Sequence, residues 1–192
     1  MKKISHRKEK NIIFLYSFAF MILTGVILLL FAADKNSFIW KIDGIGQYYP
    51  VFLYIGDYVR KAVFSFFSGH FAIPQYDLSI GMGEDIIGCL NYYGFGDPIN
   101  LISVFATHSN GQYLYAARYL LGLYMAGFSF LCYCRKVNIS ESGALLGSLT
   151  YSFCGFAICG ALRYLEWVSV LFYLPLMMAG AEEALRNNRL HL

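Results

Sequence analysis

Ile12–Ala33 reads IIFLYSFAFMILTGVILLLFAA, and this stretch decides the class of the fold. The run from Asn11 to Ala33, about 23 residues long, contains no charged side chain. About 20 apolar residues are enough for a helix to cross the hydrocarbon of a bilayer, and a signal-peptide core is only about 7–15 residues long. We therefore expect an uncleaved first transmembrane helix, with cleavage after the small residues Ala32 and Ala33 left open as the alternative.

The composition extends this reading to the whole chain. It is 58% hydrophobic and 14% charged, whereas soluble domains carry roughly 25% charged residues. The apolar residues gather in long runs, which predict three further membrane spans at about 112–134, 143–161 and 166–180. The expected fold is an all-α polytopic membrane protein with about four transmembrane helices. A net charge of +3 is too small to indicate a nucleic-acid partner.

Lys and Arg residues predict how the chain crosses the membrane. They are concentrated in residues 1–11, directly after the second span at Arg135 and Lys136, and after the fourth span in residues 181–192. An even number of spans places these three segments on one side, and the positive-inside rule makes that side cytoplasmic. Both termini are therefore expected in the cytoplasm, and residues 34–111 are expected to form a long external first loop.

Within this loop, residues 50–67 are predicted to form an amphipathic helix. Pro50 suits a first helical turn. Asp57, Arg60 and Lys61 share one face, with Asp57 and Lys61 spaced for an i,i+4 ion pair, and apolar side chains such as Ile55 and Phe66 share the opposite face. Such a helix is expected to lie in the membrane interface. Packing against another external domain is the alternative, and residues 73–100 are expected to be irregular.

Asp43 is the most suggestive chemical group. It begins the stretch Asp43-Gly44-Ile45-Gly46-Gln47-Tyr48-Tyr49-Pro50, which predicts a glycine-flanked loop just before the amphipathic helix. Glycine lets the backbone approach a ligand closely. A carboxylate there could act as a general base on a hydroxyl group or help to hold a divalent cation against a phosphate. The alternative is a simple Asp-Gly turn that leads into a helix.

Other polar groups carry weaker signals. Glu84 and Asp85 are adjacent, so their side chains diverge, and they are expected to be a poor metal pair. The cluster from Asn91 to Asn100 mixes Tyr rings with amide and acid groups, which suits either sugar stacking or an aromatic belt at the membrane surface. Glu166 and Arg163 are spaced for a helix-surface ion pair, and Arg118 is expected to snorkel or to face a polar cavity. The chain contains no Walker, GxGxxG, HExxH or nucleophile-elbow motif.

The order of these segments resembles the YfhO family of bacterial membrane proteins. The likeness is carried by Asp43–Pro50, Gly81-Met82-Gly83, Tyr92-Tyr93, Asp97-Pro98-Ile99-Asn100, Tyr151–Phe156 and Leu174-Pro175-Leu176. The resemblance implies the fold of the C-type glycosyltransferases. Family members are longer, so this chain is expected to be an N-terminal portion that is inactive alone.

The resemblance also implies a reaction at the bacterial plasma membrane. A sugar would move from a polyprenyl-phosphate carrier to a cell-envelope polymer such as teichoic acid, on the outer face. Its partners would be membrane lipid, the lipid-linked donor and the polymer acceptor, and no cofactor is expected beyond an optional divalent cation.

In such folds an acidic residue of the first external loop serves catalysis, and it maps to Asp43. The expected substrate-binding residues are Gln47, Tyr48, Tyr49, Asp77, Tyr92, Asp97 and Asn100. The family often has Trp-Asp where this chain has Tyr76-Asp77, which puts the role of Asp77 in doubt. The alternatives are a transporter of lipid-linked intermediates and a non-catalytic scaffold or truncated remnant.

Overall fold

The computed structural model describes residues 2–69, 71 and 73–187, and it describes side chains between Asn11 and Arg186. The chain divides into two compact units. The first unit combines residues up to Ser37, Leu120–Leu162 and residues from Trp167 onward, and the second combines Phe38–Tyr119 with Arg163–Glu166.

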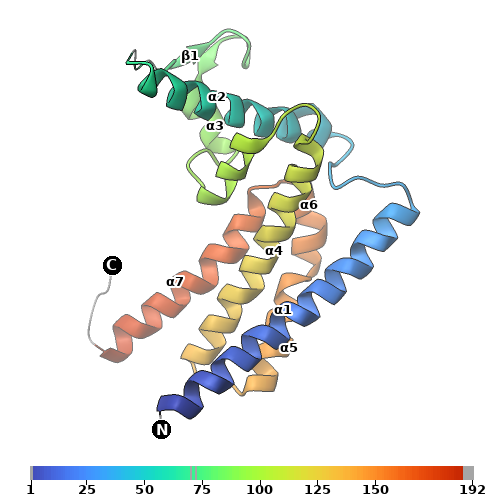
Figure 1. Cartoon of the computed structure of the whole chain (residues 1–192), viewed down its shortest axis with the longest axis vertical. Coiled ribbons are helices and arrows are strands. Elements are labelled where there is room, and N and C mark those ends of the chain that lie inside the picture. The colour runs from blue at the N-terminus through green and yellow to red at the C-terminus, as the bar shows by residue number, and fades with distance from the viewer. Residues whose placement is uncertain (1, 70, 72, 188–192) are drawn as a thin grey trace. The chain divides into compact units, whose positions relative to one another are not determined.

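The first unit is built of helices, which Figure 1 shows as coiled ribbons, and long stretches of them are apolar. It contains α1 (Lys2–Ala33), most of α4 (Gly111–Lys136), α5 (Glu141–Ser152), the π-helical turn η3 (Phe156–Gly160), the start of α6 (Ala161–Arg163), and α7 (Trp167–Asn187). Four segments of the described chain are long and apolar enough to cross a membrane: Asn11–Ala33, Gly111–Lys136, Glu141–Arg163 and Trp167–Arg186. The predicted all-α polytopic membrane fold is therefore confirmed.

Polar side chains join the helices of the first unit. The Tyr16 hydroxyl of α1 donates to the Tyr124 carbonyl at 2.7 Å and lies 3.2 Å from the Ser152 hydroxyl. The Tyr151 hydroxyl of α5 donates to the Leu171 carbonyl of α7 at 3.1 Å. Because lipid competes poorly for hydrogen bonds, such contacts help to specify how membrane helices pair.

The third apolar segment is not one regular helix. Gly147 in this segment makes room for a neighbour: a Cβ added there would lie 3.1 Å from the Phe130 ring, and Tyr151 stacks on Phe130 with ring centroids 4.6 Å apart. However, α5 ends at Ser152 and the chain continues through a π turn. Gly147 thus serves packing against Phe130 within this unit.

The second unit is built around one helix. Its elements are the π turn η1 (Gly44–Tyr48), α2 (Tyr49–Phe67), strands β1 (Tyr76–Asp77) and β2 (Glu84–Asp85), α3 (Ile86–Tyr92), the 3-10 helix η2 (Pro98–Phe105) and the first residues of α4. The two strands are antiparallel and pair Tyr76 with Asp85.

The prediction that residues 73–100 are irregular is wrong, because two aspartates there begin helices. The Asp85 side chain accepts from the Gly88 N–H at 2.5 Å and caps α3. The Asp97 side chain accepts from the Ile99 N–H at 3.0 Å and caps η2. Side-chain oxygens at this position satisfy backbone donors that a helix start leaves unpaired.

The two halves of α2 differ in how deeply their apolar side chains are buried. Ile55 and Tyr58 are buried in a core with Ile86 and Leu90, so the first half of the helix is packed within its own unit. Toward the end of α2, Phe67 is 80% exposed. An exposed aromatic surface therefore remains at the end of α2, and the position of this helix in the membrane interface stays a prediction.

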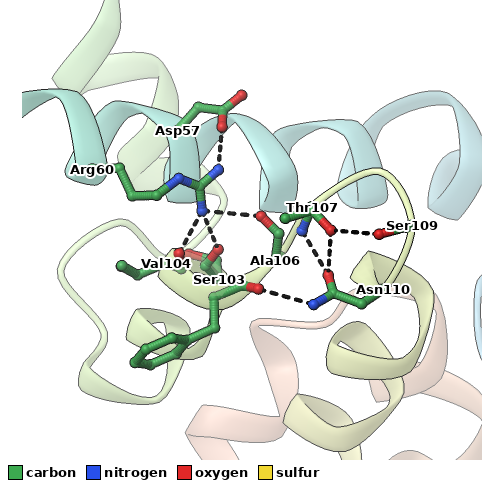
Figure 2. A network of polar contacts seen from close by, with 9 residues as sticks. Asp57, Arg60, Ser103, Val104, Ala106, Thr107, Ser109 and Asn110 are labelled. Atoms are coloured by element: carbon green, nitrogen blue, oxygen red, sulfur yellow. Dashed lines mark hydrogen bonds and ion pairs between the residues drawn. The ribbon is translucent and has the colours of Figure 1, made fainter.

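The Arg60 guanidinium links α2 to the end of η2. Figure 2 shows its guanidinium pointing at the end of η2, where it donates to the carbonyls of Val104 at 2.5 Å and Ala106 at 3.0 Å. The other guanidinium nitrogen pairs with Asp57, so the expected Asp57–Lys61 pair does not form. One cation thereby satisfies helix-end carbonyls that lack a partner within the helix.

Candidate functional site

Asp43 is helical, which corrects the predicted loop. Its φ of −68° and ψ of −34° lie in the right-handed helical region, and it directly precedes the π turn that runs into α2. A Cβ added at Gly44 would lie 3.0 Å from the Trp40 Cβ, so glycine allows this turn to fold close to the preceding segment. Single π turns within helices are frequent at functional sites.

The segment around Asp43 is held at both ends by residues 163–166. The Arg163 guanidinium lies over the Trp40 ring, 4.6 Å from its centroid. The Tyr164 ring meets the Tyr48 ring edge-on, with centroids 5.5 Å apart. These two contacts fix the chain three residues before Asp43 and five residues after it.

The Asp43 carboxylate has no partner among the described residues. Its side chain is half-buried, and it makes no hydrogen bond or ion pair with any residue in the described part of the chain. A carboxylate on a fixed turn with open hydrogen-bonding capacity is available to a ligand or to a reacting hydroxyl.

A pocket of about 440 Å³ begins one helical turn after Asp43. That volume lies within the range of about 300–1,000 Å³ that is usual for small-molecule sites. The walls come from η1, α2, α3 and the turn that joins the two strands. Its lining residues are Gly46, Gln47, Pro50, Val51, Tyr54, Ser79, Ile80, Gly81, Glu84, Cys89, Leu90 and Tyr93.

Two of the predicted substrate-binding residues belong to this pocket or its wall. Gln47 lines it and accepts a hydrogen bond from the Tyr93 hydroxyl at 3.4 Å. Asp77 lies behind the lining, where it accepts from the Tyr54 hydroxyl at 2.6 Å and from the Ser79 hydroxyl at 2.7 Å. The hydrogen bond from Tyr54, with those from Ser79, lowers the pKa of Asp77 to about 2.

The predicted tyrosines lie outside the pocket lining. Tyr48 is buried against the Tyr93 ring, and burial raises the pKa of its hydroxyl. Tyr49 meets the Tyr115 ring edge-on, with centroids 5.8 Å apart. Tyr92 is 64% exposed and packs edge-on against Tyr93. Their assignment to substrate binding stays a prediction.

Asp97 and Asn100 surround Arg118, which neither snorkels nor faces an open cavity. Its side chain is fully buried; it donates to the Asn100 side-chain oxygen and to the Leu165 carbonyl, each at 2.7 Å. Asp97 supplies the opposite charge at 3.2 Å. These contacts give Asp97 and Asn100 a structural role, while the predicted substrate contacts of both stay a prediction.

Glu166 is a further group near this region, for which the sequence predicts only a surface ion pair with Arg163. It forms no ion pair with Arg163, which stacks on Trp40 instead. Burial raises the pKa of the Glu166 carboxyl, although Arg118 and the Tyr48 hydroxyl favour its charged form. Glu166 is a single acidic residue before an apolar run, and the neighbouring sequence does not indicate that it is buried near Arg118 and Tyr48.

Glu84 and Asp85 diverge, as their adjacency predicts. Asp85 caps α3, and Glu84 lines the pocket. In the described part of the chain, no group of three His, Cys, Asp or Glu side chains is placed to hold a metal ion. Tyr54, Glu84 and Cys89 are pocket residues that the sequence did not indicate, because distant segments bring them together.

The comparisons with known proteins place the chain in a family. No curated protein and no solved structure matches it. Residues 14–192 match the family described as bacterial membrane protein YfhO, and this match covers nearly the whole chain. The resemblance seen in the sequence is thereby confirmed, and the chain belongs to the YfhO family of bacterial membrane proteins.

Proposed function

We propose that the chain is the membrane part of a glycosyltransferase that moves a sugar from a polyprenyl-phosphate carrier to a cell-envelope polymer. The observation that carries this proposal concerns the carboxylate of Asp43 and the turn on which it lies. Its carboxylate is half-buried, lacks a partner among the described residues, and sits on a turn fixed by Arg163 and Tyr164. Gln47, one turn later, opens onto the pocket.

The chemistry assigned to Asp43 is general-base catalysis. An acceptor hydroxyl oxygen forms a bond to the anomeric carbon of the donor sugar, and Asp43 takes the proton of that hydroxyl. The bond between the anomeric carbon and the phosphate oxygen breaks, and its electron pair leaves with the lipid phosphate. A positioned base of this kind contributes about 10²–10⁴-fold to a rate.

The proposal includes a location. A lipid-linked donor keeps its phosphate at the level of the headgroups, so Asp43 must emerge close to that level. The Lys and Arg residues at 135, 136 and 186 support a topology with cytoplasmic termini and residues 34–111 outside. The exposed aromatic end of α2, at Phe66 and Phe67, is compatible with a position at the lipid surface.

The test is the substitution Asp43→Asn in the native bacterial membrane, with glycosylation of the envelope polymer as the readout. The expected result is a loss of about 10²–10⁴-fold in transfer rate, because Asn keeps the shape and removes the base. Asp34→Asn is the matched control, since Asp34 is a nearby carboxylate that is exposed and precedes the same turn in the sequence. It should leave the rate unchanged.

Wild-type transfer by a well-expressed Asp43→Asn protein would overturn the catalytic assignment. Movement of labelled lipid carrier across vesicles without any sugar transfer would instead identify the chain as part of a transporter.

A further inference from the structure

We infer that the pocket beside Asp43 binds an uncharged sugar ring and excludes the phosphate of the substrate. This inference rests on the proposed function and specifies which part of the substrate enters the pocket. It is carried by three properties of the lining: its charge, its hydrogen-bonding capacity and its rigidity.

The charge of the pocket is negative. Glu84 lines it, and Asp77, behind Tyr54, stays ionised because its pKa is lowered to about 2. Among the described residues, no Lys, Arg or His lines the pocket. Lys61 is near enough to favour the charged form of Asp77, but it does not line the pocket. Like charges repel, so an anion is disfavoured here.

The hydrogen-bonding groups are mainly acceptors. The hydroxyl protons of Tyr54 and Ser79 are both donated to Asp77, which leaves the oxygen lone pairs of these hydroxyls for a ligand. Glu84 adds a carboxylate, and the Gln47 amide nitrogen supplies donors because its oxygen is engaged by Tyr93. A sugar presents several hydroxyl donors, whereas a phosphate presents acceptors.

The lining is preorganised by short-range contacts. Asp77 fixes the hydroxyl end of Tyr54, and the aromatic rings of Tyr54 and Tyr93 give the pocket apolar walls for the C–H face of a sugar. Gly81 has a φ of +52°, and a Cβ added there would lie 2.7 Å from the Glu84 carboxyl carbon. The glycine therefore leaves room for the Glu84 side chain to lie over the turn.

Cys89 provides a natural reporter, because its thiol lines the same pocket. The other cysteines, Cys132, Cys134, Cys154 and Cys159, are replaced by Ala, and the full chain is studied in nanodiscs. Sugar-based detergents are avoided because their headgroups would compete. Burial raises the pKa of the Cys89 thiol, so alkylation by a membrane-impermeant maleimide is measured at mildly alkaline pH.

The probes are glucose, galactose, N-acetylglucosamine, glucose 1-phosphate and inorganic phosphate. A sugar at about ten times its Kd leaves about one pocket in eleven empty and slows alkylation about tenfold. We expect at least one neutral sugar to protect Cys89, and glucose 1-phosphate and phosphate to give no protection. If no neutral sugar protects, or if glucose 1-phosphate protects as well as glucose, the inference is overturned.

Two variants locate the effect. Gln47→Ala should weaken protection, whereas Gln112→Ala, at an exposed glutamine outside the pocket, should not. Glu84→Gln should admit glucose 1-phosphate, while Glu141→Gln should behave as the wild type. Each rate is compared with and without sugar in the same variant, so a change in the basal reactivity of Cys89 cancels. A Glu84→Gln protein that still excludes glucose 1-phosphate would show that the Glu84 carboxylate does not cause the exclusion.

The alkylation experiment distinguishes sugar binding in the pocket from catalysis by Asp43. Asp43→Asn should keep the protection of Cys89 while losing sugar transfer. Protection without any role of Asp43 in transfer would leave the sugar site intact and refute the catalytic proposal alone.

Discussion

Two aspartates of the second unit differ in what their carboxylates do. Asp97 caps η2 with one oxygen and pairs with the buried Arg118 through the other. Asp43 has no partner in the described part of the chain, although the turn that carries it is fixed by Trp40 and Tyr48. Both aspartates lie in polar, aromatic stretches of sequence.

The difference separates carboxylates that hold the fold from those available for chemistry. Asp77 lies between the two cases: its oxygens are occupied by Tyr54 and Ser79, yet through them it shapes the pocket. A carboxylate whose acceptor sites are filled from inside the protein serves a substrate only indirectly.

The largest effect is expected from removing Arg118, the partner of Asp97. Arg118→Ala should destabilise the protein by about 3–5 kcal/mol, because it leaves Asp97 as a buried charge without its partner. Thermal unfolding in nanodiscs measures the effect. Asp43→Asn is the matched control and should unfold at the wild-type temperature, so equal unfolding temperatures for all three proteins would contradict the structural role of Asp97.

A smaller effect is expected at Arg163, a positioning residue for the Asp43 turn. Arg163→Ala removes the cation that stacks on Trp40, a contact worth about 0.5–1 kcal/mol at an exposed site. We expect sugar transfer to fall several-fold through kcat with little change in KM, since the turn loses one of its supports.

Arg163→Lys should restore part of the lost rate, because the cation is retained. A rate for Arg163→Ala equal to that of the wild type would show that Asp43 does not depend on this contact.

The smallest expected effect is the contribution of Glu166 to the pH dependence of stability. Its pKa is raised above the ordinary 4.5 by burial, so the folded state favours the neutral acid. The stability linked to this group is therefore fully present below pH 4.5 and is lost as the pH rises through its folded-state pKa.

Glu166→Gln, which is always neutral, should raise the unfolding temperature slightly at neutral pH and not in acid. A variant that is destabilised at neutral pH would show that the contacts of Glu166 with Arg118 and Tyr48 outweigh its burial.

The sequence predicts the membrane fold well, because the length and apolar composition of a run are enough to indicate a membrane-spanning helix. The helix that follows Pro50 is also visible in the sequence, as α2 shows by beginning at Tyr49 and ending at Phe67. The short elements after it were missed because Asp85 and Asp97 act as helix caps within stretches that read as polar loop.

The candidate site was only partly predictable. Asp43 and Gln47 are close in sequence, so one motif contains both. Tyr54, Glu84 and Cys89 come from α2, β2 and α3, and only tertiary packing places them around one pocket. The burial of Arg118 likewise depends on Leu165, which is 47 residues away along the chain.

The π turn at Gly44–Tyr48 has a consequence for how the family can vary in length. A π turn holds one residue more than the α turn it replaces. Deleting a single residue there would restore a regular α-helix and rotate everything before it by about 100° around the helix axis. The buried face of α2 would keep its register, while Asp43 would move to another side of the helix, so a one-residue deletion here would displace the candidate base and leave the packing of α2 in place.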